Sequence, residues 1–157
     1  MRAILDALKD PQRRVWLFDS FEGLPKPDPE SFQQDKDDPH WRYAFCLAVR
    51  LEQVKDNFEK YELLDERTQF VKRLVSRHDS PPEVTNISVL RLDGDMYEST
   101  WLVLNHLYPK VSPGGFIIVD NYRAIPSCRA AVDNFRAQQS ILSPISKVDW
   151  TGIFWRK

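Results

Sequence analysis

Two apolar runs that each end in acidic residues constrain the fold of this chain more than any other feature. The first run, Ser88–Leu92, is followed by Asp93–Asp95, and the second, Phe116–Val119, is followed by Asp120 and Asn121. Runs with so few polar residues, separated by a segment long enough for a helix, are typical of neighbouring parallel strands covered on both faces. We therefore expect an α/β fold whose ligand crevice lies outside the carboxyl ends of these strands.

The residues at these strand ends suit a divalent cation. Mg²⁺ prefers carboxylate and carbonyl oxygens, keeps several waters and accepts substrate oxygens at open positions. Asp93, Asp120 and Asn121 would supply such oxygens. The alternative is that Asp120 caps the next helix while Asp93 and Asp95 stabilise a turn. Three acids at two adjacent strand ends favour the metal site over this alternative.

The composition is that of one globular domain. The chain has 157 residues, of which 42% are hydrophobic and 29% are charged, so it can bury a substantial core. Its 22 basic and 23 acidic side chains are interspersed, which argues against nucleic acid as a partner. No apolar run approaches the ~20 residues that cross a bilayer, and the first residues lack a signal-peptide pattern. We expect no membrane partner and a cytoplasmic location, and the oligomeric state stays open, a homo-oligomer included.

The remaining pattern predicts alternating helices and strands. Apolar residues from Leu47 to Tyr61 recur at separations of four and three, which predicts a long helix with one side in the core. A segment rich in proline and acids, 25–39, is expected to be a loop and is a candidate lid over a substrate. We further expect helices at 2–9, 41–61, 98–108 and after 126, and strands at 15–18, 69–75, 145–148 and 152–155, the last two antiparallel.

Asp19 lies at the carboxyl end of the strand expected at 15–18. In sheets that bind adenosyl groups, an acid at this place can accept both ribose hydroxyls, because a carboxylate offers two well-spaced acceptor oxygens. A turn or a helix cap would use an acid here equally well. The spacing alone leaves both interpretations open.

Two long motifs, Leu92–Thr100 and Tyr108–Tyr122, contain the acidic strand ends, and further motifs lie at Val15–Pro25, Asn57–Leu64 and Val148–Arg156. Together they resemble the macrocin O-methyltransferase (TylF-like) family over almost the whole chain. The resemblance implies a Rossmann-like class I methyltransferase sheet, mostly parallel with a C-terminal antiparallel pair. It also implies S-adenosyl-L-methionine and Mg²⁺ as cofactors, and methylation of a sugar hydroxyl of a natural product as the reaction.

The resemblance also implies roles for individual residues. Asp93 and Asp120 match metal ligands, and Asp95 matches the general base that takes the proton of the acceptor hydroxyl. Asn121 stands where a second aspartate is usual in the family. It keeps an oxygen ligand but removes one negative charge, so we expect weaker metal binding. The residues that the resemblance assigns to the cofactor are Asp19, Ser20, Phe21 and Asp79.

A Gly-x-Gly turn is missing from this sequence. Domains that bind adenosylmethionine normally begin with a strand and such a turn, whereas the chain has five glycines and none before Gly23. We therefore expect a single, N-terminally truncated methyltransferase domain over 1–157. The missing strand would lie between those at 15–17 and 89–92, and the chain alone is expected to bind the cofactor weakly and to be inactive.

Two other functions stay open. One is a non-catalytic remnant of a methyltransferase domain. The other is a metal-dependent glycosyltransferase that binds its nucleotide sugar with Asp93-Gly94-Asp95, because some of these enzymes use an Asp-x-Asp motif. Comparing the binding of adenosylmethionine with that of a nucleotide sugar would separate these functions.

Overall fold

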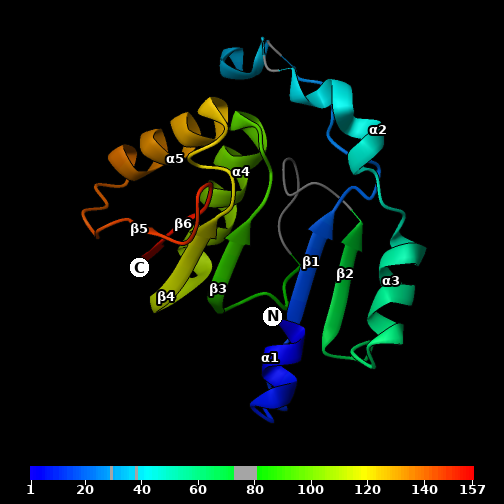
Figure 1. Ribbon diagram of the computed structural model, residues 1–157. Helices are drawn as coiled ribbons and strands as arrows, with labels where there is room; N and C mark the ends of the chain where they lie inside the picture. Colours follow the sequence, from blue (N-terminus) through cyan, green and yellow to red (C-terminus); the bar gives the residue numbers. More distant parts are fainter. Residues whose placement is uncertain (29, 38, 73–80) are drawn as a thin grey trace. The chain divides into compact units, whose positions relative to one another are not determined.

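The computed structural model describes residues 1–28, 30–37, 39–72 and 81–157, apart from the side chains of 43–45 (Figure 1). The chain divides into two compact units. One is formed by Met1–Lys26 with His40–Leu74, and the other by Pro27–Pro39 with Val75–Lys157. This division leaves the prediction of a single domain over 1–157 untested.

A pair of parallel strands forms the sheet of the first unit. Strand β1 (Val15–Asp19) pairs with β2 (Thr68–Lys72). Helix α3 (Leu51–Lys60) lies beside β2, where the rings of Phe58 and Phe70 meet edge to face at 5.6 Å (Figure 1). The last residues of the strand expected at 69–75 lie outside the described part of the chain. The other helical elements of this unit are α1 (Arg2–Ala7), η2 (His40–Tyr43) and α2 (Ala44–Leu47).

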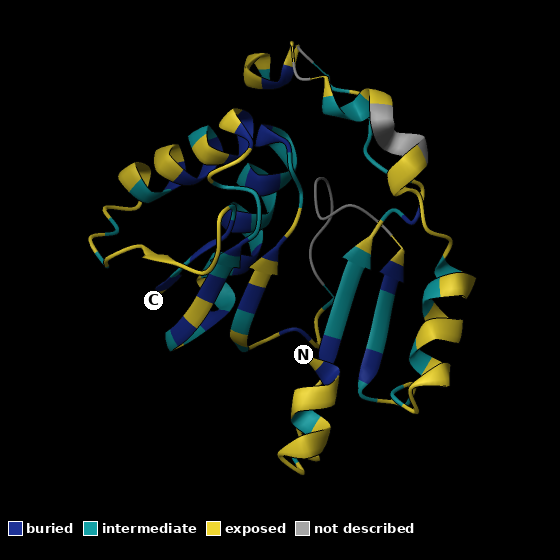
Figure 2. Cartoon of the chain, viewed as in Figure 1, coloured by how far each residue is buried: buried dark blue, intermediate teal, exposed yellow. Residues whose placement is uncertain are grey.

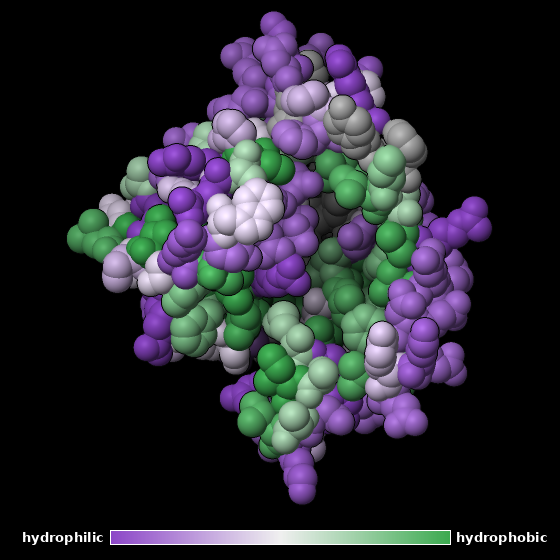
Figure 3. All heavy atoms as spheres, in the orientation of Figure 1, coloured by the Kyte–Doolittle hydropathy of each residue, from purple (hydrophilic) through white to green (hydrophobic). Residues whose placement is uncertain are grey.

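Ion pairs hold the start of helix α1. Ile4 and the C-cap residue Leu8 are exposed, whereas Arg2 is only 3% exposed. Figure 3 shows the exposed apolar side chains in this region as a green patch over α1. Arg2 tolerates burial because Nη2 lies 2.5 Å from Oδ2 of Asp65 and Nη1 lies 3.4 Å from Oδ1 of Asp6.

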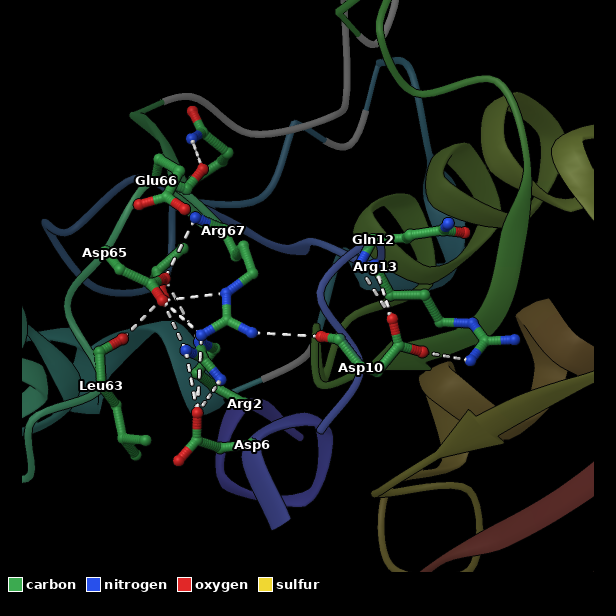
Figure 4. A network of polar contacts seen from close by, with 11 residues as sticks. Arg2, Asp6, Asp10, Gln12, Arg13, Leu63, Asp65, Glu66 and Arg67 are labelled. Carbon is green, nitrogen blue, oxygen red and sulfur yellow. Dashed lines mark hydrogen bonds and ion pairs between the residues drawn. The ribbon is translucent and has the colours of Figure 1, made fainter. Parts of the chain in front are cut away.

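A second arginine shares the same carboxylate (Figure 4). Nη2 of Arg67 lies 2.6 Å from Oδ2 of Asp65, and Nη1 donates to the carbonyl of Asp10 at 3.1 Å. The hydrogen bonds from Arg2 and Arg67 hold the pKa of Asp65 well below its usual range. This network ties α1 to the segment that leads into β2.

The prediction of one long helix at 41–61 is wrong, because the structure divides this stretch into η2, α2 and α3. Residues 48–50 are not helical. Leu47 and Tyr61, which were expected in the core, are 52% and 70% exposed, and α3 has no buried residue. Most helical stability in proteins comes from packing of an apolar face. A face with so little to pack against gains little from a continuous helix.

Four strands in the order β3-β4-β6-β5 form the sheet of the second unit. Strands β3 (Ile87–Leu92) and β4 (Val111–Val119) are parallel, and β6 (Ile153–Arg156) pairs antiparallel with β4 and with β5 (Ser146–Lys147). The predicted α/β fold and its C-terminal antiparallel pair are thus confirmed.

Two helices pack together in the core of this unit, and Figure 2 shows their buried positions in dark blue. They are α4 (Tyr97–Leu107) and α5 (Pro126–Gln138), joined by an edge-to-face contact of Trp101 with Phe135 at 6.4 Å. They correspond to the helices expected at 98–108 and after 126. None of the described helices is long and apolar enough to span a membrane. The remaining elements are η1 (Gln33–Asp35) and η3 (Tyr108–Lys110).

Candidate active site

The ends of β3 and β4 bring four of the predicted site residues together. Asp93 and Asp95 follow β3, while Asp120 and Asn121 follow β4, and the parallel register sets the two strand ends level. Nδ2 of Asn121 donates to Oδ1 of Asp93 at 3.4 Å and also to a carboxylate oxygen of Asp95. We call these four residues the acid cluster.

Arg91 brings a positive charge to the acid cluster. Its guanidinium pairs with Asp120 through Nη2 and through Nε, which lies 3.3 Å from Oδ1, and Nη2 also lies 3.6 Å from Oδ2 of Asp93. The sequence reasoning missed this residue. A signal was available, because an arginine between Leu90 and Leu92 has its side chain on the opposite face of the strand from both leucines.

Among the described residues, the ion pairs of the acid cluster join the guanidinium of Arg91 to two of its carboxylates, those of Asp93 and Asp120. Burial and the charge of Asp120 raise the pKa of Asp93 above its ordinary value, while the charge of Arg91 acts in the opposite direction. The negative charge of Asp93 is therefore unfavourable in its surroundings, and a bound cation would stabilise it.

A tight loop presents Asp95. Its φ is +59°, a left-handed conformation that aspartate adopts more readily than most residues other than glycine. A Cβ on the preceding Gly94 would lie 2.8 Å from Oγ of Ser99. The same hydroxyl donates to the carbonyl of Gly94 at 2.5 Å. The loop therefore needs glycine at position 94, because the start of α4 approaches it so closely.

The turn after β1 holds three of the predicted cofactor-binding residues. Oδ1 of Asp19 accepts a hydrogen bond from the amide of Phe21 at 2.6 Å, and Oγ of Ser20 donates to the carbonyl of Gly23 at 3.0 Å. Phe21 is buried with a φ of +57°. Asp19 thus closes a turn, as one of the two interpretations of the sequence had it. The carboxylate of Asp19 is exposed. Its contact with the ribose of the cofactor stays a prediction.

The metal and adenine assignments stay predictions. Asp79 lies outside the described residues. Within the described ranges, no group of three or more histidine, cysteine, aspartate or glutamate side chains could hold a metal ion. The predicted set differs from such a group because its third member is an amide, that of Asn121. Two carboxylates and an amide oxygen nevertheless fit the chemistry of Mg²⁺, and a half-turn of the amide would present its oxygen.

Comparisons with known proteins give a consistent result. A family model described as "Macrocin-O-methyltransferase (TylF)" matches residues 1–157. The chain is 46% identical over 156 residues to the 8-demethyl-8-(2,3-dimethoxy-alpha-L-rhamnosyl)-tetracenomycin-C 4'-O-methyltransferase of Streptomyces olivaceus. It is 40% identical over 157 residues to the demethyldecarbamoylnovobiocin O-methyltransferase of Streptomyces niveus.

The similarity extends to the fold and to nearly every residue of the chain. The structure of the O-methyltransferase NovP matches with a TM-score of 0.95 at 40% identity, over 100% of this chain and 65% of that one. The two curated relatives are matched over 99% and 100% of this chain but over 59% and 60% of their own lengths. The chain thus spans about three fifths of the curated relatives it matches.

Proposed function

Because the chain belongs to the macrocin O-methyltransferase (TylF) family, we propose that it serves to transfer a methyl group from S-adenosyl-L-methionine to a sugar hydroxyl of a natural product. The observation that carries the proposal is the acid cluster at the ends of two parallel strands. The name of the tetracenomycin relative, which specifies a rhamnosyl group and a 4'-O position, supports the acceptor class. The interspersed charges of the chain favour a small molecule over nucleic acid.

The proposed reaction is a displacement at the methyl carbon. The acceptor oxygen forms a bond to this carbon while the carbon–sulfur bond breaks, and its electron pair stays on sulfur to give S-adenosylhomocysteine. Asp95 takes the proton of the acceptor hydroxyl. An alcohol is a poor nucleophile at neutral pH, so a carboxylate in hydrogen-bond reach contributes roughly 10²- to 10⁴-fold to the rate.

Asp93, Asp120 and Asn121 would hold Mg²⁺, which when bound lowers the pKa of a neighbouring hydroxyl. Arg91 pairs with both carboxylates of this set. The guanidinium and a metal ion would therefore compete for the same oxygens. We infer that Arg91 holds the ends of β3 and β4 together until a metal ion takes its place at the carboxylates of Asp93 and Asp120.

The adenosyl group would lie against the turn after β1. We propose that Asp19, Ser20 and Phe21 contact its ribose and that Asp79 contacts the adenine. The exposed carboxylate of Asp19 at the end of a parallel strand supports the ribose contact, because ligands of such sheets bind outside the carboxyl ends of strands.

The test is transfer of a labelled methyl group from adenosylmethionine to rhamnosides with free hydroxyls, with and without Mg²⁺. In a preparation that transfers methyl groups, we expect the transfer to depend on Asp95 and to be lost on chelation. Titration with a nucleotide sugar such as UDP-glucose is the matched measurement. Binding of the nucleotide sugar without binding of adenosylmethionine would favour the glycosyltransferase function instead.

A second candidate is a domain that keeps the fold without turnover. Isothermal titration of the purified chain with adenosylmethionine separates the two candidates. Weak binding without methyl transfer would favour the second, and stoichiometric micromolar binding would exclude it.

A further inference from the structure

Helix α4 begins two residues after Asp95, and its own N-cap residue, Met96, makes no side-chain capping bond. Its first amides are bound from a distant part of the chain. Oδ1 of Asp35 accepts the amide of Tyr97 at 2.8 Å, and Oδ2 accepts the amide of Glu98 at 2.8 Å. Asp35 is 1% exposed and lies 62 positions before Tyr97.

This arrangement has a clear physical basis. The first amides of a helix have no partners within the helix and carry the positive end of its dipole. A carboxylate that accepts two of them is therefore stable even when it is buried. Asp95, which is nearer in sequence, is turned towards Asn121. Asp35 thus supplies the cap that this helix does not obtain from its own N-cap residue.

An aromatic contact accompanies the hydrogen bonds that the carboxylate of Asp35 accepts. The ring of Phe32, three residues before Asp35, lies 5.9 Å from the ring of Tyr97, which stacks on Trp101 at 5.7 Å. The hydroxyl of Tyr97 accepts a hydrogen bond from Nδ2 of Asn134 at 3.1 Å. Tyr97 is therefore fixed through its amide and through its ring.

We propose that Asp35 is a positioning residue for Asp95, an inference that rests on the proposed function. It acts through the first turn of α4. The loop from Gly94 to Met96 lies between two fixed points, the hydrogen bond from Ser99 to Gly94 and the pairing of Asp35 with the amides of Tyr97 and Glu98. Two residues of the segment 25–39, which was predicted to be a loop and a candidate lid, are thus attached to the first turn of α4, namely Phe32 and Asp35.

The experiment compares two charge-removing variants of the same segment in the full chain. Asp35→Asn keeps the shape of the side chain but loses its charge and replaces one acceptor by a donor. Asp37→Asn makes the same change at an exposed position. Hydrogen exchange is followed by NMR at the amides of residues 94–98. Asp35→Asn should lower protection at Tyr97 and Glu98 by about 3- to 30-fold, the range expected for loss of a helix cap, and Asp37→Asn should leave it unchanged.

Three exchange results would overturn the proposal. They are unchanged protection in Asp35→Asn, an equal loss in Asp37→Asn, and a uniform loss that extends through β4 and α5. The last would mean that Asp35 supports the whole unit and not the loop in particular.

Kinetics give the second readout. Asp35→Asn should lower kcat by about tenfold or more while the KM for adenosylmethionine stays within about twofold, and Asp35→Glu should recover part of the loss. An equal rise in KM would contradict positioning of the base. If no preparation that contains this chain transfers a methyl group to a hydroxylated acceptor, the proposed function fails, whereas the exchange result still decides whether Asp35 holds the loop.

Discussion

Each unit contains a cluster of acids and arginines, and the pKa of one aspartate is shifted in opposite directions in the two clusters. In the first unit, Arg2 and Arg67 share the carboxylate of Asp65, and its pKa is lowered. In the second, Arg91 pairs with Asp93 and Asp120, and burial and the charge of Asp120 raise the pKa of Asp93. A carboxylate held by two arginines stabilises the fold, whereas a carboxylate whose charge is opposed by burial and by another carboxylate is suited to binding a cation.

The largest expected effect concerns Asp95, the proposed base in the acid cluster. In a preparation that transfers methyl groups, Asp95→Ala should lower turnover by roughly 10²- to 10⁴-fold, because the acceptor loses its proton acceptor. Affinity for adenosylmethionine should stay nearly intact. An equal loss of cofactor affinity would make Asp95 a structural or binding residue.

The next effect concerns the metal. Asp93→Asn and Asp120→Asn should each weaken Mg²⁺ binding by about 10- to 100-fold or more, since even loss of an outer-shell partner has an effect of that size. Isothermal titration with Mg²⁺ measures it. Asp65→Asn, which changes the carboxylate shared by Arg2 and Arg67, is the control and should leave the Mg²⁺ affinity unchanged. Unchanged affinity in both acid-cluster variants would remove the metal site from the proposal.

The role of Arg91 as a competitor can be tested by removing its charge. Arg91→Gln should strengthen Mg²⁺ binding a few-fold, because an exposed ion pair contributes about 0.2–1 kcal/mol and its loss frees the oxygens of Asp120. Weaker binding would show that Arg91 organises the ligands instead of competing for them.

Asn121→Asp should act in the same direction. It restores a carboxylate beside Asp120 and should strengthen Mg²⁺ binding by a few-fold, about the effect of one added charge near the surface. The same titration tests it. No gain would mean that the side chain at position 121 does not contact the metal.

The smallest effect is the pH dependence of stability, which should have opposite signs in the two clusters. Asp65 has a lowered pKa when folded, so it stabilises the protein above its unfolded pKa of about 4, and this contribution is lost as the pH falls through the lower, folded pKa. The deficit of Asp65→Asn against wild type should therefore shrink in acid.

Asp93 has a raised pKa when folded, so its charge is unfavourable above that pKa and the penalty disappears as the pH falls through it. Asp93→Asn should therefore be more stable than wild type near neutral pH and lose this advantage in acid. Urea unfolding of both variants from neutral to acidic pH measures the two slopes. If the stability difference from wild type changed with pH in the same direction in both variants, the opposite pKa shifts of Asp65 and Asp93 would be contradicted.

The sequence predicted the acid cluster because its members lie next to strands. An apolar run fixes where a strand ends, and a parallel register places the next strand's end beside it. The contact of Asn121 with Asp93 and Asp95 follows from that rule. Arg91 lies on β3, but its pairing with Asp120 depends on the neighbouring strand β4. The spacing of residues along the sequence does not reveal that pairing.

The sequence failed where long-range contacts decide the structure. Arg2 is buried because Asp65, 63 positions away, pairs with it. The helix expected at 41–61 is interrupted because its apolar face, with Leu47 exposed, has little to pack against. Asp35 looked like one acid among several in a loop, and only the position of α4 shows its function as a cap. Local patterns carry no information about such partners.

The first unit is not formed by one continuous stretch of the sequence, and this affects the order in which interacting residues are synthesised. Residues 27–39 interrupt the first unit in sequence but belong to the second. Asp35 therefore emerges from the ribosome 62 residues before Tyr97, whose amide it binds. At about 5–20 residues per second, it waits roughly 3–12 seconds for its partner. During that interval the first unit can assemble before the amide that Asp35 binds in the second unit has been synthesised.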